Sequence, residues 1–172
     1  MAKSKSRSAR AGRPSRPRSV TRSRQAVPPP AATALSFLYI ESSGLLAALL
    51  EHDASSRAAL RGHGRRVTSA LTLAEAARGV LRARIAGRLT PDEERTAIRA
   101  LRTFERRCTI ISVTDAVLTR AGRPFPVEPI RTLDAIHLAT AELLGEAPQL
   151  VTVVTRDTRV RENAQALGYM VA

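Results

Sequence analysis

Four acidic residues occupy positions from which their side chains could meet at one site. Glu41 and Asp157 each follow an apolar run typical of a buried strand, while Glu75 and Asp134 lie in the first turns of predicted helices. Carboxylates gathered in one pocket raise one another's pKa values, which is unfavourable unless a divalent cation compensates. Hard oxygen ligands with few other donors suit Mg²⁺ or Mn²⁺. The residue types therefore predict a site for one of these cations.

Each acid also has a purely structural interpretation. Glu75 fits a capping box with Thr72, and Asp134 and Asp157 lie at helix starts, where free backbone N–H groups and the helix dipole favour acids. Glu41 is harder to explain in this way, because Glu is a poorer helix cap than Asp. Singly, the structural interpretation is preferred for most of these acids. Their combination is more informative than any one of them.

The elements that would position these acids alternate between strand and helix. Strands are predicted over 35–40, 66–70, 108–113, 150–154 and 169–171, and helices over 43–52, 55–62, 73–86, 91–107, 133–144 and 158–167, with a short helix after Asp115. Several strands are apolar throughout, which indicates a mainly parallel sheet covered on both faces. We expect an α/β fold, a three-layer α/β/α sandwich. Ligands bind such sheets beyond the carboxyl ends of the strands, where the four acids would meet.

The positive charge is concentrated at the N-terminus. The chain has 172 residues and a net charge of +13, but residues 1–24 hold nine basic residues and no acid. The remaining 19 basic and 15 acidic residues give the rest of the chain only +4. We expect residues 1–33, rich in Arg, Ser and Pro, to be a disordered tail and 34–172 to form one domain. The tail has three interpretations: no function, a nucleic-acid-binding arm, or an organelle transit peptide.

Several classes of protein are excluded by what the sequence lacks. Cys108 is the single cysteine, so there is no internal disulfide framework, and a reducing cytoplasm is the expected compartment. There is no uncharged apolar run of about 18 residues, so no membrane span is expected. Neither a phosphate-binding Gly-Lys loop nor a Ser-His-Asp or Cys-His arrangement is present. Nucleotide hydrolysis and acyl transfer therefore have no support.

Four segments carry a pattern in their order and spacing. They are LYIESSGL at 38–45, TSALTLAE at 68–75, RTLDAIHLATA at 131–141 and VTRDTRV at 154–160. Together they resemble the PIN-domain ribonucleases of the VapC toxin type. The resemblance extends over about 35–172, and the third segment is the most specific of the four.

The resemblance implies the toxin of a type II toxin–antitoxin pair, an endoribonuclease that hydrolyses RNA phosphodiester bonds with Mg²⁺ or Mn²⁺. It implies an RNA substrate, a cognate antitoxin as partner, and a homodimer. Carried over by position, Glu41, Glu75, Asp134 and Asp157 are the catalytic acids. Of these, Glu41, Asp134 and Asp157 would bind the metal, directly or through water. Glu75 would position the attacking water or a second ion.

This sequence departs from the family at position 41, where the family has Asp. Glu keeps the charge but moves the carboxylate by up to about 1.5 Å, the length of one carbon–carbon bond. We expect Glu41→Asp to match or exceed wild-type activity. The alternative function is a catalytically impaired PIN-fold binding protein that keeps antitoxin or RNA binding. Ser43 and Thr155 match hydroxyl residues of the family's first and last motifs.

Other polar residues have weaker signals. His137 lies three residues after Asp134 and is interpreted as a buried or supporting histidine rather than a metal ligand. Arg78 and Arg82, four residues apart on a predicted helix, belong either to a solvated face or to a surface for phosphates or the antitoxin. Only 3% of the residues are aromatic, so recognition of RNA should depend on backbone charge rather than base stacking.

Overall fold

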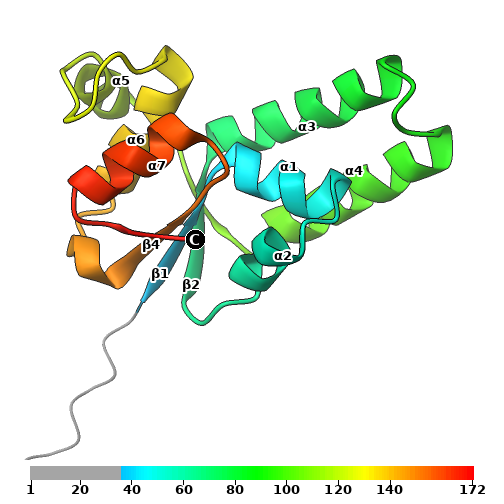
Figure 1. The fold of residues 1–172 in the computed structure, drawn as a ribbon, viewed down its shortest axis with the longest axis horizontal. Coiled ribbons are helices and arrows are strands. Elements are labelled where there is room, and N and C mark those ends of the chain that lie inside the picture. Colours follow the sequence, from blue (N-terminus) through cyan, green and yellow to red (C-terminus); the bar gives the residue numbers. More distant parts are fainter. Residues whose placement is uncertain (1–35) are drawn as a thin grey trace, which may run out of the picture. The chain divides into compact units, whose positions relative to one another are not determined.

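A parallel β-sheet lies at the centre of the computed structural model, which describes residues 36–172 (Figure 1). The strands are β1 (Phe37–Ile40), β2 (Arg65–Ser69), β3 (Thr109–Ile111), β4 (Val151–Val154) and β5 (Met170–Val171). Their order is β3-β2-β1-β4-β5, and every neighbouring pair is parallel. β1 is therefore central, and Ile40 at its carboxyl end is aligned with Thr68 of β2 and Val154 of β4.

Helices cover both faces of the sheet (Figure 1). One layer contains α1 (Ser42–Leu50), α2 (Ala54–Leu60), α3 (Ala70–Ile85) and α4 (Pro91–Glu105). The other contains α5 (Asp115–Ala121), α6 (Thr132–Glu142) and α7 (Thr158–Ala166), and a 3-10 turn at Pro148–Leu150 leads into β4. The predicted three-layer α/β/α sandwich with a parallel sheet is confirmed.

β1 is buried on both faces, which explains its continuous apolar sequence. Successive side chains of a strand point to opposite faces of the sheet. Phe37 and Tyr39 accordingly pack into a core formed with α5, α6 and α7. Leu38 and Ile40 pack into a second core formed with α1, α3 and α4. A strand between two cores needs apolar residues at every position.

The caps decide where two of the helices begin. The Oγ atom of Ser69 accepts a hydrogen bond from the backbone N–H of Leu71 at 3.2 Å, so α3 begins at Ala70, three residues before its predicted start. α4 begins at Pro91, as predicted, and Thr90 and Glu93 form a capping box there. The first of these caps removes the structural role expected for Glu75.

The predicted tail, residues 1–33, lies outside the described residues, and so does Leu35 at the predicted start of the first strand. The disorder and the function of the tail stay predictions. Within residues 36–172, no helix has the length and apolar character needed to cross a membrane.

Candidate active site

Glu41 directly follows β1 and caps α1, and its carboxylate is surrounded by donors. Glu41 is 3% exposed. Oε2 accepts hydrogen bonds from the backbone N–H of Ser43 at 3.0 Å, from the Ser43 hydroxyl, and from the Thr155 hydroxyl at 2.9 Å. Oε1 accepts a hydrogen bond from the Ser42 hydroxyl at 2.5 Å. The carboxylate is therefore held in one orientation, and its capping role shows that even this acid has a structural function.

Ser43 connects the start of α1 with the loop that follows β4. Its Oγ atom accepts hydrogen bonds from the backbone N–H groups of Arg156 at 2.8 Å and of Asp157 at 3.1 Å. Gly44 permits this close approach, since a Cβ atom there would lie 2.8 Å from the backbone oxygen of Val154. The ends of β1 and β4 are thus joined through residues that the family pattern had singled out.

Asp157 is the N-cap of α7, as its structural interpretation predicted. Its Oδ1 atom accepts hydrogen bonds from the backbone N–H groups of Arg159 at 2.8 Å and Val160 at 3.2 Å. An acid used as a cap through one oxygen keeps the lone pairs of the second for another ligand.

Asp134 is not a helix cap, although it lies in the first turn of α6. The N-cap of that helix is Arg131, and no side chain makes the capping hydrogen bond. The Oδ2 atom of Asp134 is buried without a hydrogen-bond partner among the described residues. Loss of hydration raises the pKa of the Asp134 carboxyl, and the nearby charges of Asp157 and Glu41 raise it further. Asp134 therefore lies at the start of α6, as its structural interpretation predicted, but its side chain does not cap the helix.

Glu75 does not belong to a capping box, because α3 starts at Ala70 and places Glu75 in its second turn. Its Oε2 atom lies 2.7 Å from Nε2 of His137, and its side chain is 23% exposed. Partial burial alone would raise the pKa of the Glu75 carboxyl. The hydrogen bond and charge of His137, with smaller contributions from Ser42 and Arg82, outweigh that effect and lower the pKa below its usual range.

His137 is buried at the centre of the site, with 1% of its surface exposed. Its Nε2 atom is 3.8 Å from Oε1 of Glu41 as well as 2.7 Å from Glu75, and its Nδ1 atom is 3.2 Å from the Tyr39 hydroxyl. The prediction of a buried, supporting histidine agrees with these contacts. Sequence reasoning did not single out Tyr39, although a Tyr within an otherwise apolar strand signals a hydroxyl that needs a buried partner.

The residues fit a divalent cation. One oxygen each of Glu41 and Glu75 and one ring nitrogen of His137 lie within 4.8 Å of one another. Asp134 adds a buried oxygen that has no partner in the part of the chain that the structure describes, and the charges of Asp157 and Glu41 help to raise the pKa of its carboxyl. A cation would relieve that repulsion and satisfy the oxygen. Direct ligation by Glu41, Asp134 and Asp157 stays a prediction.

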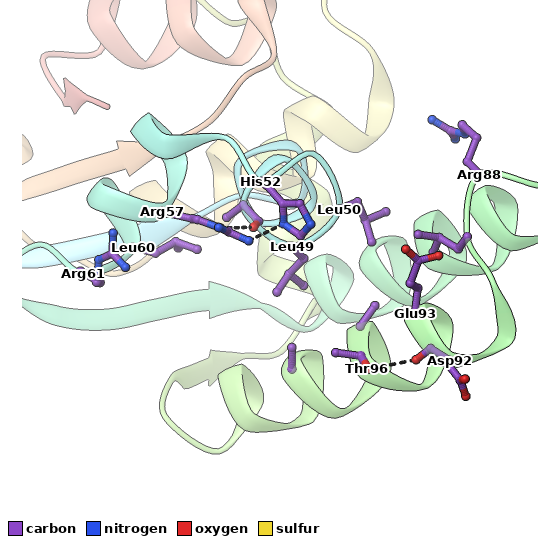
Figure 2. Close-up of a pocket in the computed structure, with 14 residues that line it drawn as sticks. Leu49, Leu50, His52, Arg57, Leu60, Arg61, Arg88, Asp92, Glu93 and Thr96 are labelled. Carbon is purple, nitrogen blue, oxygen red and sulfur yellow. Dashed lines mark hydrogen bonds between the residues drawn. The ribbon is translucent and has the colours of Figure 1, made fainter.

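A groove of about 700 Å³ lies apart from the acids, where α1 and α2 face α4 (Figure 2). Its lining includes Leu49, Leu60 and Ala97 as apolar residues, and Arg57 and Arg61 as basic ones. Arg57 donates a hydrogen bond to the backbone oxygen of Ala48 at 3.0 Å and contacts His52 (Figure 2). None of the four acids lines this groove, so it is separate from the candidate active site.

Comparisons with known proteins agree with this geometry. A family model described as the PIN domain matches residues 38–166. Ribonuclease VapC46 of Mycobacterium tuberculosis is 35% identical over 139 residues, which are 80% of this chain and 97% of that protein.

Two solved structures share the fold. One is VapBC2 from Rickettsia felis bound to a DNA fragment from their promoter, with a TM-score of 0.54 and 16% identity, covering 79% of this chain and 97% of that chain. The other is VapBC-1 from nontypeable Haemophilus influenzae, with a TM-score of 0.50 and 15% identity, covering 79% of this chain and 96% of that chain. At these identities the similarity concerns the fold alone.

Proposed function

Because this chain belongs to the PIN-domain family, in its VapC branch, we propose that it is a divalent-metal-dependent endoribonuclease and the toxin of a toxin–antitoxin pair. The observation that carries the proposal is a buried oxygen of Asp134 that has no hydrogen-bond partner within residues 36–172 and lies near the charges of Asp157 and Glu41. A buried carboxylate without a partner destabilises the folded state. A bound cation would compensate its charge and would explain why it is there.

Three of the acids would hold the cation, namely Glu41, Asp134 and Asp157. Ser42, Ser43 and Thr155 orient Glu41 through hydrogen bonds to both of its oxygens. Asp157 presents its second oxygen while the first caps α7. Mg²⁺ or Mn²⁺ bound there would supply a water of lowered pKa and neutralise charge on the phosphate oxygens. Glu75, held by His137, is placed to orient the attacking water or to ligate a second ion.

Basic residues near the acids would hold the RNA backbone. The charge of Arg82 contributes to the lowered pKa of Glu75, and the charge of Arg131 acts on Asp134, so both lie close to the site. Arg156 is exposed between Thr155 and Asp157. Arginine binds phosphate oxygens through a planar set of donors, without regard to base identity. We therefore assign phosphate contacts to Arg82, Arg131 and Arg156.

An antitoxin partner is part of the proposal, and the two structural neighbours, which are VapBC2 and VapBC-1, support it. A homodimer and a cytoplasmic location follow from the family resemblance and are proposed on that basis. Sedimentation of the purified chain, alone and with the product of an adjacent gene, measures both assemblies. A monomer at micromolar concentration would contradict the proposed dimer.

Cleavage of total RNA by the full chain tests the enzymatic proposal. We expect discrete fragments with Mg²⁺ or Mn²⁺, none with EDTA, and none with the Asp134→Asn variant. Asp115→Asn is the matched control, because Asp115 is also in the first turn of a helix but is exposed and distant in sequence from the four acids. A folded protein that binds the metal but leaves RNA intact would contradict the proposal and favour the non-cutting, partner-binding alternative.

A further inference from the structure

Both ring nitrogens of His137 have partners that come from different elements. Nε2 lies 2.7 Å from Glu75 on α3, and Nδ1 lies 3.2 Å from the hydroxyl of Tyr39 on β1, while His137 itself is on α6. Tyr39 and His137 are each 1% exposed, so the contact between them is shielded from water, whereas Glu75 is partly exposed. The three side chains therefore form a continuous series of contacts, from Tyr39 in the sheet through His137 in one helix layer to Glu75 in the other.

The partners decide which nitrogen of His137 carries the proton. A neutral imidazole has one N–H donor and one acceptor nitrogen, and an ionised carboxylate only accepts. Glu75 therefore needs the N–H at Nε2, and the Tyr39 hydroxyl can donate to the lone pair of Nδ1. The opposite arrangement would direct the Nε2 lone pair at the carboxylate. The Glu75 carboxylate thus requires the N–H at Nε2, and the Tyr39 hydroxyl, which can donate or accept, anchors the ring through Nδ1.

The hydrogen bond from His137 holds the Glu75 carboxylate near the Glu41 carboxylate. Without it, we expect the Glu75 side chain to move away. Glu75 has a flexible side chain, and one of its oxygens lies within 4.8 Å of an oxygen of Glu41, so the like charges repel. Without the bond, rotation toward solvent would relieve this repulsion, since Glu75 is only partly buried. Hydrogen bonds that orient a metal-binding carboxylate are a general determinant of metal affinity.

We propose that His137 is a positioning residue, which Tyr39 anchors through Nδ1 and which holds Glu75 beside Glu41 in the orientation that a divalent cation requires. The inference rests on the proposed metal site and adds two residues to it. His137 acts through Glu75 and does not itself ligate the cation. Its Nε2 atom is committed to the carboxylate, and imidazole is a softer ligand than Mg²⁺ selects.

Binding of Mn²⁺ to the full chain, followed by the EPR signal of the free ion, tests the proposal without RNA or turnover. We expect His137→Leu to weaken Mn²⁺ binding by about 10- to 100-fold, the usual effect of losing a partner of a ligating group. His137→Gln can place an amide N–H near the position of Nε2, so it should recover most of the affinity. Tyr39→Phe should weaken binding in the same direction but less. His63→Gln, at an exposed histidine, is the matched control and should bind like the wild type.

A double-mutant cycle separates positioning from a general structural effect. In a Glu75→Ala background, His137→Leu should change Mn²⁺ affinity by no more than about twofold, within the additivity error of such cycles. Thermal unfolding of each variant reports whether it is folded. If His137→Leu does not fold, Tyr39→Phe and His137→Gln carry the same comparison.

Three results would overturn the inference. Unchanged Mn²⁺ affinity in folded His137→Leu would show that Glu75 is held without His137. A ¹⁴N coupling from a bound imidazole in the pulsed EPR spectrum of the Mn²⁺ complex would make His137 a direct ligand. Absence of Mn²⁺ binding by the wild type would remove the metal site itself, and the proposed metal-dependent function with it, which distinguishes that failure from the other two.

Discussion

The contacts of Glu41 change the activity that we expect of the Glu41→Asp variant, which would restore the residue that the family has at this position. Four donor groups from Ser42, Ser43 and Thr155 surround the Glu41 carboxylate. Asp would withdraw that carboxylate by up to about 1.5 Å and lengthen these bonds. Whereas the family pattern predicted equal or higher activity for Glu41→Asp, we now expect cleavage to fall by about tenfold or more.

The value of kcat/KM for a mapped RNA target measures this effect. Glu51→Asp, at the exposed C-cap of the same helix, is the control and should retain wild-type activity. Activity of Glu41→Asp at or above wild type would restore the expectation drawn from the sequence.

Asp134 should destabilise the metal-free protein, because its folded-state pKa is raised by lost hydration and by the charges of Asp157 and Glu41. This loss of folding stability is fully present when the pH is above the folded-state pKa of Asp134. It disappears when the pH is below the ordinary pKa of Asp, about 3.9. We therefore expect Asp134→Asn to raise Tm near pH 7 in EDTA, on the order of 2 °C for a chain of this size. Its advantage should shrink as the pH falls toward 3.9.

Calorimetry across that pH range measures the difference, with Asp115→Asn as the control. An advantage for Asp134→Asn that grew on acidification would contradict the direction of the pKa change.

At the scale of the elements, the start of α1 must approach the end of β4 for Ser43 to reach the loop that holds Asp157. Gly44 makes this possible, because a Cβ atom would meet the Val154 backbone oxygen at 2.8 Å and the Val154 side chain at 3.2 Å. We expect Gly44→Ala to lower the free energy of unfolding by about 1–3 kcal/mol, as overpacking usually does. It should also weaken Mn²⁺ binding, since α1 can relieve the contact only by moving away from β4.

Urea unfolding measures the first effect. Gly122→Ala is the matched control, because its Cβ would have ordinary contacts of 3.6 Å or more and its φ of −77° suits any residue. That variant should be neutral or more stable by up to about 1 kcal/mol. Equal stability of both variants would show that α1 adapts to a methyl group at 44.

The element boundaries show what local sequence can predict. Apolar runs and caps such as Thr90 act within a few residues, and the strands and helices they indicated were found within a few positions of their predicted bounds. The start of α3 was misplaced because two hydroxyl residues, Ser69 and Thr72, could each cap a helix. Only the actual end of β2 decides between them.

For the whole molecule, cation binding should couple the site to global stability. A ligand that binds only the folded state stabilises it by about 2.7 kcal/mol at a concentration 100 times its Kd. We expect saturating Mn²⁺ to raise the Tm of the wild type and of Asp115→Asn, and to change that of Asp134→Asn little. Thermal scans with Mn²⁺ and with EDTA measure this difference. Equal shifts in all three proteins would place the bound ion elsewhere.

The sequence by itself determined the parallel α/β/α architecture, because apolar strands that alternate with helices form such a sheet. It also predicted that the four acids share one site, because ligands bind beyond the carboxyl ends of parallel strands. Tertiary structure decided what each acid touches. Glu75 is 62 residues from His137, and Tyr39 is 98, so no local signal encodes these contacts. A hydrogen bond of 2.7 Å exists only when the packing of α3, β1 and α6 fixes its atoms to within tenths of an ångström. The partnerless oxygen of Asp134 is likewise a property of the packed site, since burial is defined only once the chain has folded.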